Sequence, residues 1–148
     1  MDWQLELMYA GRAVAAALLG AVIGWERQWH GRDAGVRTYA AVSLGACVFT
    51  LVSSHIPGAD PSRIAANIVT GVGFLGGGIL LRDAGRTRGL TTAATIWSTA
   101  AVGTAMGYGM YPLSVLTALI VFAVLAVHHF PGWQRITEGE TEEQHSDI

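Results

Sequence analysis

The run at residues 71–80, GVGFLGGGIL, has the residue types of a phosphate-binding turn, because Gly71, Gly73 and Gly76 match the pattern G-x-G-x-x-G. In a dinucleotide enzyme these glycines follow a strand, open a helix, and precede an acidic residue by about 20 positions. Here the residue at that spacing after Gly76 is Ile96. The preceding DPSRIAANIV is typical of a helix start. The run therefore favours a role other than nucleotide binding.

Close packing between helices is the second interpretation of these glycines, because small residues let the backbones of membrane helices approach each other. On a helical projection Gly73, Gly76 and Gly77 share one side, while Gly71 and Gly78 fall on the other. This predicts a central third helix with close neighbours on two sides. Three G-x-x-x-G pairs are the expected packing motifs: Gly20 with Gly24, Gly73 with Gly77, and Gly103 with Gly107. A rival interpretation is that the glycines loosen the third helix for gating.

Polar residues stand at the ends of the apolar segments, where they are expected to form one network. The predicted members are Glu26, Arg27, Arg37, Thr38, Arg82, Thr91 and Thr92. We expect Arg82 to end the third helix, and Glu26 to pair with Arg37 or Arg82 in bidentate geometry. Thr91 and Thr92 are expected to cap the fourth helix. The network is interpreted as a structural clamp with topology signals, as a contact for a small anion or phosphate, or as a surface that docks a protein.

A second polar set is expected at the other membrane surface, and it comprises Asp60, Arg63 and Asn67. Asp60 can cap the third helix, and Pro61 suits its first position. Asn67 is expected to bond across helices. The lone Cys47 excludes an intramolecular disulfide and is interpreted as a small apolar residue. The sequence has no Ser-His-Asp order, zinc-ligand spacing or P-loop, so we predict that the protein is not an enzyme.

The elements that position these residues are long apolar segments. Of the 148 residues, 51% are hydrophobic and only 14% are charged, against roughly 25% charged in soluble domains. Five apolar segments are predicted, at residues 5–25, 38–54, 64–81, 90–107 and 113–129. They predict an all-α, polytopic membrane bundle of about five transmembrane helices. We expect residues 1–133 to form this transmembrane domain and the acidic residues 134–148 to form a disordered cytoplasmic tail.

Arginine distribution predicts the topology, since the chain has no lysine. With five spans, seven of the nine arginines fall on one side of the membrane: Arg27, Arg32, Arg37, Arg82, Arg86, Arg88 and Arg135. The positive-inside rule then places the N-terminus outside and the C-terminus in the cytoplasm.

The chain has more small-residue helix faces than the core of one bundle needs. These faces predict a homodimer or higher homo-oligomer through Gly20 with Gly24 and Gly103 with Gly107. Membrane lipid is the other expected partner, and nothing points to nucleic acid.

Four motifs in order resemble the MgtC/SapB family of bacterial inner-membrane proteins. They are GWER at residues 24–27, AGVRT at 34–38, GVGFLG at 71–76 and RGLTTAAT at 88–95. The resemblance covers roughly residues 19–111, with a compatible last helix. It implies a multi-pass protein of the bacterial inner membrane, similar to the family's hydrophobic domain without the soluble C-terminal domain of many members. In that family the glycine run is a packing signature.

The resemblance implies a non-enzymatic regulator linked to adaptation to magnesium limitation, to virulence and to control of the F-type ATP synthase. Another membrane protein, such as that synthase, is then the implied partner. The alternative is a cation transporter or channel component that carries Mg²⁺. Mg²⁺ prefers oxygen ligands and sheds water reluctantly, and the last two segments contain no acidic residue. We therefore expect no resident cofactor and no dedicated Mg²⁺ cage, while a path for the hydrated ion stays open.

Overall fold

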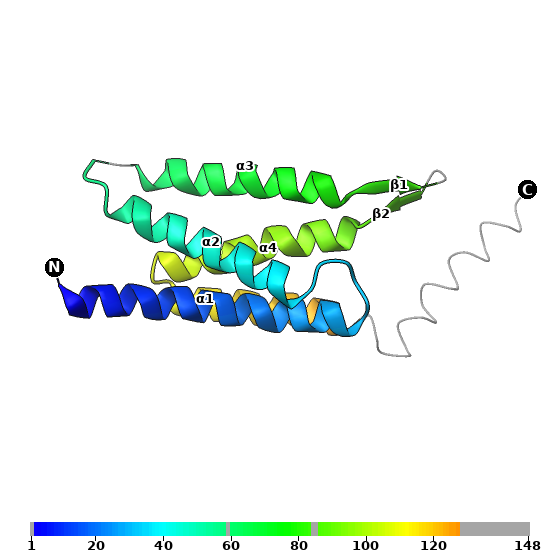
Figure 1. Cartoon of the computed structure of the whole chain (residues 1–148), viewed down its shortest axis with the longest axis horizontal. Coiled ribbons are helices and arrows are strands. Elements are labelled where there is room, and N and C mark those ends of the chain that lie inside the picture. The colour runs from blue at the N-terminus through cyan, green and yellow to red at the C-terminus, as the bar shows by residue number, and fades with distance from the viewer. Residues whose placement is uncertain (1, 59, 84–85, 128–148) are drawn as a thin grey trace, which may run out of the picture.

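A computed structural model of the chain describes residues 2–58, 60–83 and 86–127, and for residues 81–83 and 86–88 it describes the backbone only. These residues form five α-helices and one β-hairpin (Figure 1). The helices are α1 (Trp3–Trp29), α2 (Val36–Ser54), α3 (Pro61–Ile79), α4 (Leu90–Gly107) and α5 (Tyr111–Val127). The strands β1 (Leu81–Asp83) and β2 (Arg86–Arg88) pair antiparallel between α3 and α4, with Arg82 opposite Thr87.

Each predicted apolar segment corresponds to one helix, so the five-helix prediction is confirmed for the described residues. α4 has the predicted bounds, and the largest shift moves the end of α1 from residue 25 to Trp29. The predicted end at residue 129 and the tail at 134–148 lie outside the described residues. The hairpin was not predicted. Arg82 does not end the third helix, because α3 stops at Ile79 and the extended Leu80 leads into β1.

Local sequence signals explain where α3 and α4 begin. Asp60 caps α3 by accepting a 2.9 Å hydrogen bond from the backbone N–H of Ser62, and Pro61 occupies the first turn, as predicted. The start of α4 differs from prediction, because Gly89 is its N-cap and has a φ of 89°. A Cβ at Gly89 would lie 2.6 Å from the Ile79 carbonyl oxygen. Glycine is therefore required both by this conformation and by the close approach of α3.

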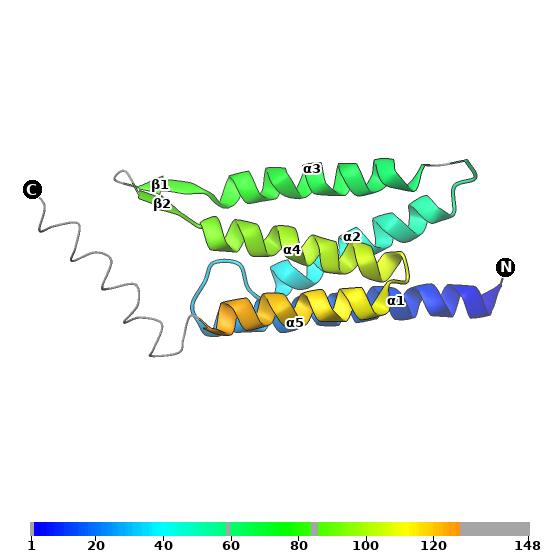
Figure 2. The same ribbon diagram turned by 180° about the vertical axis from the view of Figure 1, so that it is seen from behind.

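The helices lie nearly side by side in one elongated bundle (Figures 1 and 2). We call the end with the β-hairpin the hairpin end; α1 and α5 finish there, and α2 and α4 begin there. We call the other end, where α1 and α3 begin, the N-terminal end. The hairpin end thus gathers the segments that carry Glu26, Arg37 and Thr91.

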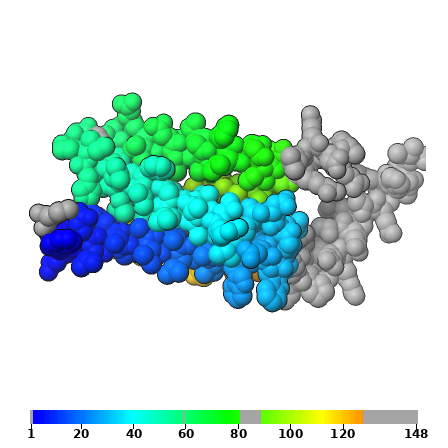
Figure 3. All heavy atoms as spheres, in the orientation of Figure 1, coloured from blue at the N-terminus to red at the C-terminus, as the bar shows by residue number. Residues whose placement is uncertain are grey.

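The central helix is α4, which packs against each of the other four helices. The prediction that the third helix is central is wrong. α3 lies along one edge of the bundle and packs mainly on α4 (Figure 3). Only Val72 and Gly76 of α3 are buried, against ten residues of α4. The glycines of α3 thus belong to a helix that buries few side chains. A helical projection of the sequence cannot distinguish such a helix from one that is surrounded by neighbours.

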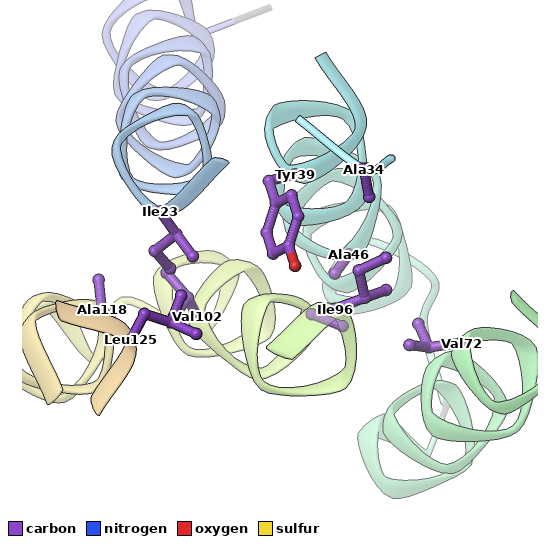
Figure 4. Packing of buried hydrophobic residues seen from close by; sticks show 10 residues of the cluster. Ile23, Ala34, Tyr39, Ala46, Val72, Ile96, Val102, Ala118 and Leu125 are labelled. Atoms are coloured by element: carbon purple, nitrogen blue, oxygen red, sulfur yellow. The ribbon is translucent and has the colours of Figure 1, made fainter. Parts of the chain in front are cut away.

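The apolar core lies where α1, α2, α4 and α5 meet. Figure 4 shows the Tyr39 ring extending from α2 toward α4, with Ile96 near its hydroxyl, while Val102 lies by Ile23 and Leu125 and Val72 projects from α3. Cys47 belongs to a second apolar cluster with Ala16, Leu51 and Met106. Among the described helices, α1 and α2 are both long and apolar enough to cross a membrane, and α5 is a shorter apolar helix. Large apolar side chains also cover the outside of the bundle, such as Phe74, which is 85% exposed.

Candidate functional site

The first glycine motif binds α1 tightly to α2. A Cβ at Gly20 would overlap the Tyr39 carbonyl oxygen, and it would lie 2.8 Å from the Cβ of Ser43. A Cβ at Gly24 would lie 2.8 Å from the Cα of Val36. Distances under about 3 Å leave no room for a methyl group beside a backbone, so glycine is required at both positions.

The third glycine motif makes the same kind of contact on the other side of α2. A Cβ at Gly103 would overlap the Ser43 carbonyl oxygen, and one at Gly107 would lie 2.7 Å from the Cβ of Thr50. Ser43 is therefore the point where α1, α2 and α4 come closest, and its side chain is fully buried. These four glycines use their small faces within one chain. The expectation that Gly20, Gly24, Gly103 and Gly107 form subunit contacts is thus contradicted.

The glycines of α3 have quite different surroundings. A Cβ added at Gly71, Gly73, Gly77 or Gly78 would meet no atom within 4 Å among the described residues, and one at Gly76 would lie in ordinary contact with Ala93, at 3.6 Å. The expectation that Gly71, Gly73 and Gly77 pack closely inside the chain is therefore wrong. α3 touches α4 along the single face that holds Val72 and Gly76. The rest of its glycine-rich surface is open.

A groove of about 480 Å³ separates α3 from α2. Its α2 wall is made of small and aromatic residues, including Gly45 and Phe49, and its α3 wall includes Ile68 and Gly71. Asn67 is the one residue with a polar side chain in the lining. The predicted bond from Asn67 to another helix is absent within the described part of the chain, where its exposed side chain has no hydrogen-bond partner. An open apolar groove with one amide suits an apolar partner that carries a polar group.

At the hairpin end, α1 buries a charged pair. Glu26 and Arg27 are 7% and 5% exposed, and the Glu26 carboxylate lies 3.6 Å from Arg27 Nη1. The same carboxylate lies 3.0 Å from His30 Nδ1, one turn along α1. Because a buried carboxylate is costly unless it is paired, these contacts make Glu26 a structural member of the α1 end. The spacing Glu26–His30 is i,i+4, a signal that the sequence contained and that the predicted network did not include.

A hydroxyl pair links α2 to α4 beside this charged pair. The Tyr39 and Thr95 hydroxyl oxygens lie 2.6 Å apart, and Thr95 also lies 2.9 Å from the Thr91 carbonyl oxygen. Because a threonine hydroxyl has one hydrogen, which it donates to a carbonyl of its own helix, Tyr39 must donate to Thr95. The Tyr39 hydroxyl also lies within electrostatic reach of Glu26 and Arg27. Nothing in the local sequence signals this pair, since its members are 56 positions apart.

The remaining predicted members of the network do not join it within the described side chains. Arg37 and Thr38 are exposed at the start of α2. Thr91 is exposed and Thr92 is buried, and neither caps α4, whose N-cap is Gly89. The side chain of Arg82 lies outside the described residues. The structure therefore brings together Glu26 and Arg27 of the predicted set and adds His30, Tyr39 and Thr95 to them.

Arg12 forms a separate cluster at the N-terminal end. Its Nε donates to the Tyr111 hydroxyl at 2.7 Å, and its Nη1 donates to the Gly107 carbonyl oxygen at 3.1 Å. The guanidinium also lies over the rings of Tyr9 and Tyr111, at 5.6 and 5.3 Å from their centres. From the sequence alone, Glu6 and Asp60 are also possible partners of Arg12. Arg12 instead binds the carboxyl end of α4, where backbone carbonyls lack helical partners.

Asp60 and Arg63, at the start of α3, are both exposed. Hydrogen bonds from Ser62 lower the pKa of Asp60, which therefore stays ionised as the cap of α3. The Tyr108 hydroxyl donates to the Pro61 carbonyl oxygen at 2.7 Å and ties the start of α3 to the end of α4. Across the described ranges, no three His, Cys, Asp or Glu side chains gather in a way that could hold a metal ion.

Comparison with known proteins identifies the family of this bundle. The sequence profile of the MgtC family matches residues 13–130, which include all four glycine contacts to α2 and the whole of α3. The chain belongs to the MgtC family. The expected resemblance to MgtC/SapB proteins is thus confirmed, and it agrees with the two helices that are apolar enough to span a membrane.

Two curated relatives in the MgtC family are similar over most of the chain. Protein MgtC of Salmonella typhimurium is 47% identical over 117 residues, which are 79% of this chain and 51% of that protein. The "Putative magnesium transporter YhiD" of Escherichia coli is 44% identical over 128 residues, which are 80% of this chain and 59% of that protein. The chain spans about half the length of the curated relatives it matches. No solved structure matches the chain.

Proposed function

We propose that this protein is a multi-pass protein of the bacterial inner membrane, in which all five helices span the bilayer and the N-terminus lies outside. One observation supports this orientation, and a second supports insertion in the membrane. The end of α1, the loop after it, the start of α2 and the β-hairpin lie together at the hairpin end, and they carry six of the arginines behind the topology prediction. Large exposed apolar side chains surround the bundle between its two ends, as contact with lipid requires.

Cysteine labelling tests this orientation. In a Cys47→Ala background, cysteine is introduced at exposed Ser62 of the N-terminal end or at exposed Asp33 of the hairpin end. An impermeant maleimide added to intact cells is expected to label Ser62→Cys and to spare Asp33→Cys until the membrane is opened. Labelling of Asp33→Cys in intact cells would reverse the topology.

Within that membrane, the protein acts as a non-enzymatic regulator that binds another membrane protein through α3. The open surface of α3 carries this proposal. Ala66, Thr70, Gly73 and Gly77 are all exposed and fall on one side of α3, away from the buried Val72. Helices associate in lipid by close packing of such small-residue faces. In this chain the other G-x-x-x-G faces are already filled by α2, so α3 is the helix left to receive a partner.

The family suggests what the partner does. The resemblance to MgtC/SapB proteins links the protein to magnesium limitation, to virulence and to the F-type ATP synthase. A membrane subunit of that synthase is therefore the proposed partner.

The same α3 face would also serve as the contact of a homodimer, because the glycines of α1 and α4 are already in contact with α2. Native mass spectrometry in mild detergent tests the dimer, and monomers across several detergents and in nanodiscs would refute it.

Proton pumping tests the regulatory role. Inverted membrane vesicles that contain the F-type ATP synthase are prepared with and without this protein, and ATP-driven acidification is followed with a pH-sensitive dye. We expect the protein to slow acidification and Gly73→Leu to abolish this effect. Gly71→Leu is the matched control, because Gly71 lines the groove and lies off the Gly73 face. Equal inhibition by Gly73→Leu at equal membrane content would exclude the α3 contact, and no inhibition by the unaltered protein would exclude the synthase.

Transport of Mg²⁺ is the second candidate function, and the name of the Escherichia coli relative favours it. Proteoliposomes that contain only this protein and a Mg²⁺-sensitive dye separate the two functions. A regulator leaves the dye signal equal to that of empty liposomes. A saturable Mg²⁺ influx would instead assign transport to the bundle itself.

A further inference from the structure

We propose that the groove between α2 and α3 is a binding site for one phospholipid, with an acyl chain in the groove and the head group at the N-terminal end. The inference rests on the proposed insertion of α3 into the bilayer. It does not depend on the identity of any protein partner. It assigns a ligand to a surface distinct from the Gly73 and Gly77 face.

The length of the groove is close to that of the hydrocarbon part of one lipid. Its α3 wall extends from Ile64 to Leu75, a rise of about 16 Å at 1.5 Å per residue. The hydrocarbon core of a bilayer is about 30 Å thick, so the chains of one leaflet extend over about 15 Å. Because α3 runs from Pro61 to Ile79, the groove opens about one turn from the start of the helix and continues past its middle. An acyl chain that enters at the N-terminal end can lie along this groove.

The walls of the groove suit an acyl chain. Apart from Asn67 the lining is aliphatic or aromatic, with Val42 and Phe49 on one side and Ile68 and Val72 on the other. At its middle the groove has no side chain to fill it, because a Cβ at Gly45 or Gly71 would meet no atom within 4 Å among the described residues. An unfilled space in lipid loses van der Waals contacts on both walls. A flexible chain that is thinner than a helix restores these contacts.

One row of α3 residues follows the chemical order of a phospholipid. Arg63, Asn67, Gly71 and Leu75 are spaced four apart, so they lie along one side of α3 from the N-terminal end toward the midplane. In the same direction a phospholipid presents phosphate, ester and hydrocarbon. Arg63 matches the phosphate, the Asn67 amide can donate to an ester carbonyl, and the open Gly71 makes room for the chain. Side chains of a helix lean toward its N-terminus, which brings the Asn67 amide nearer to the membrane surface.

The charge at the start of α3 agrees with this assignment. The first turn of α3 contains no acidic residue, and the N-terminal end of a helix favours negative charge. Asp60 is the one carboxylate at this helix end, and it is bonded to the Ser62 backbone N–H. Arg63 is exposed, so its guanidinium can reach a phosphate at the membrane surface.

A photoactivatable lipid tests the proposal. The protein is reconstituted in nanodiscs with a phosphatidylglycerol that carries a diazirine in one acyl chain, and labelled residues are mapped by mass spectrometry. We expect labels to concentrate on Phe49 and Ile68 of the groove relative to the lipid-facing Phe74 and Leu119. Gly71→Leu should remove the groove label, because the leucine fills the space that the chain occupies. Asn67→Leu should lower it about fivefold, the effect of losing one net hydrogen bond.

Gly73→Leu is the matched control, since it adds the same side chain at a position of α3 that does not line the groove. It should leave the groove label unchanged while it abolishes regulation of the partner. Failure of the lipid site and failure of the proposed function are therefore distinguishable. Labels spread evenly over groove and outer surface would overturn the proposal, as would an unchanged groove label in a stably folded Gly71→Leu. Crosslinks from the groove to a second copy of the chain would assign a protein occupant and would also overturn it.

Discussion

The two glycine-rich regions of this protein behave in opposite ways. On α1 and α4, Gly20, Gly24, Gly103 and Gly107 press against the backbone of α2 with no space for a methyl group. On α3, Gly71, Gly73, Gly77 and Gly78 face open space. The comparison shows that a G-x-x-x-G pattern allows another helix to approach closely. Whether a helix does so, and which one, depends on the rest of the fold.

Other contacts follow the same division. α2 is held by glycines on two sides and by the Tyr39–Thr95 hydroxyl pair. α3 packs along one face only. The Tyr108 hydroxyl bonds to the start of α3, and Gly89 approaches Ile79 closely at its end. Parts with few buried contacts open most readily. The locked α1–α2–α4 unit thus positions α3, and most of the glycine-rich surface of α3 stays open.

The largest effect is expected from Gly103→Ala. The new methyl group would overlap the Ser43 carbonyl oxygen, and a backbone on each side leaves no flexible group to yield. Overpacking costs typically 1–3 kcal/mol, and we expect a loss of about 3 kcal/mol or more here. Thermal unfolding in detergent measures it, with Gly71→Ala as the control in open space. Equal stability of Gly103→Ala and the unaltered protein would remove the locked half of the comparison.

The next largest effect is expected from Arg12→Met, which tests how firmly α1 is bound to the end of α4. The substitution removes the hydrogen bonds to the Tyr111 hydroxyl and the Gly107 carbonyl oxygen, together with a long one to Met8 Sδ, and keeps an unbranched side chain. A charged hydrogen bond contributes about 1.5–3 kcal/mol, so a loss in that range is expected in the free energy of unfolding. Arg63→Met is the control for removing an exposed charge. A loss no larger than that of the control would show that the Arg12 cluster does not stabilise the bundle.

A smaller effect is expected from breaking the hydroxyl pair that links α2 to α4. Tyr39→Phe should cost about 1 kcal/mol, because one buried hydrogen bond to Thr95 is lost. When Thr95→Val is added to Tyr39→Phe, the further loss of stability should be smaller than the loss from Thr95→Val alone. The expected coupling energy is about 0.5–1 kcal/mol. The four proteins of this cycle are compared by unfolding under identical detergent conditions. Additive losses would mean that the 2.6 Å contact carries no energy of its own.

The smallest effect is expected in the open half, from Gly77→Ala. No atom would meet the new methyl group within the described part of the chain, and alanine favours a helix over glycine by about 1 kcal/mol. We therefore expect unchanged or slightly raised stability of the purified monomer. Unfolding in detergent checks this against Gly107→Ala, which should be clearly destabilised by its 2.7 Å contact with Thr50. Destabilisation of both variants to the same extent would erase the difference between the two regions.

Local sequence signals predicted the parts of the fold that depend on neighbours along the chain. Long apolar runs predicted the five helices, and Asp60 with Pro61 predicted the start of α3. The β-hairpin was missed because its strands are three residues each and carry no apolar alternation. Within the predicted polar network, Glu26 pairs with its sequence neighbour Arg27 and not with Arg37, one of the two predicted partners. The pairing of Tyr39 with Thr95 could not be predicted, because only the packing of α2 on α4 brings them together.

The sequence by itself determined that the chain is an apolar helical bundle of the MgtC family, since hydrophobicity and family motifs are local properties of the chain. Tertiary structure alone decided which helix is central, which glycines are in contact and where Arg12 finds its partners. The physical reason is that glycine and arginine are permissive residues: one tolerates a close neighbour and the other can reach several acceptors. The role of such a residue therefore depends on the neighbouring surface that it contacts, and that surface belongs to another helix.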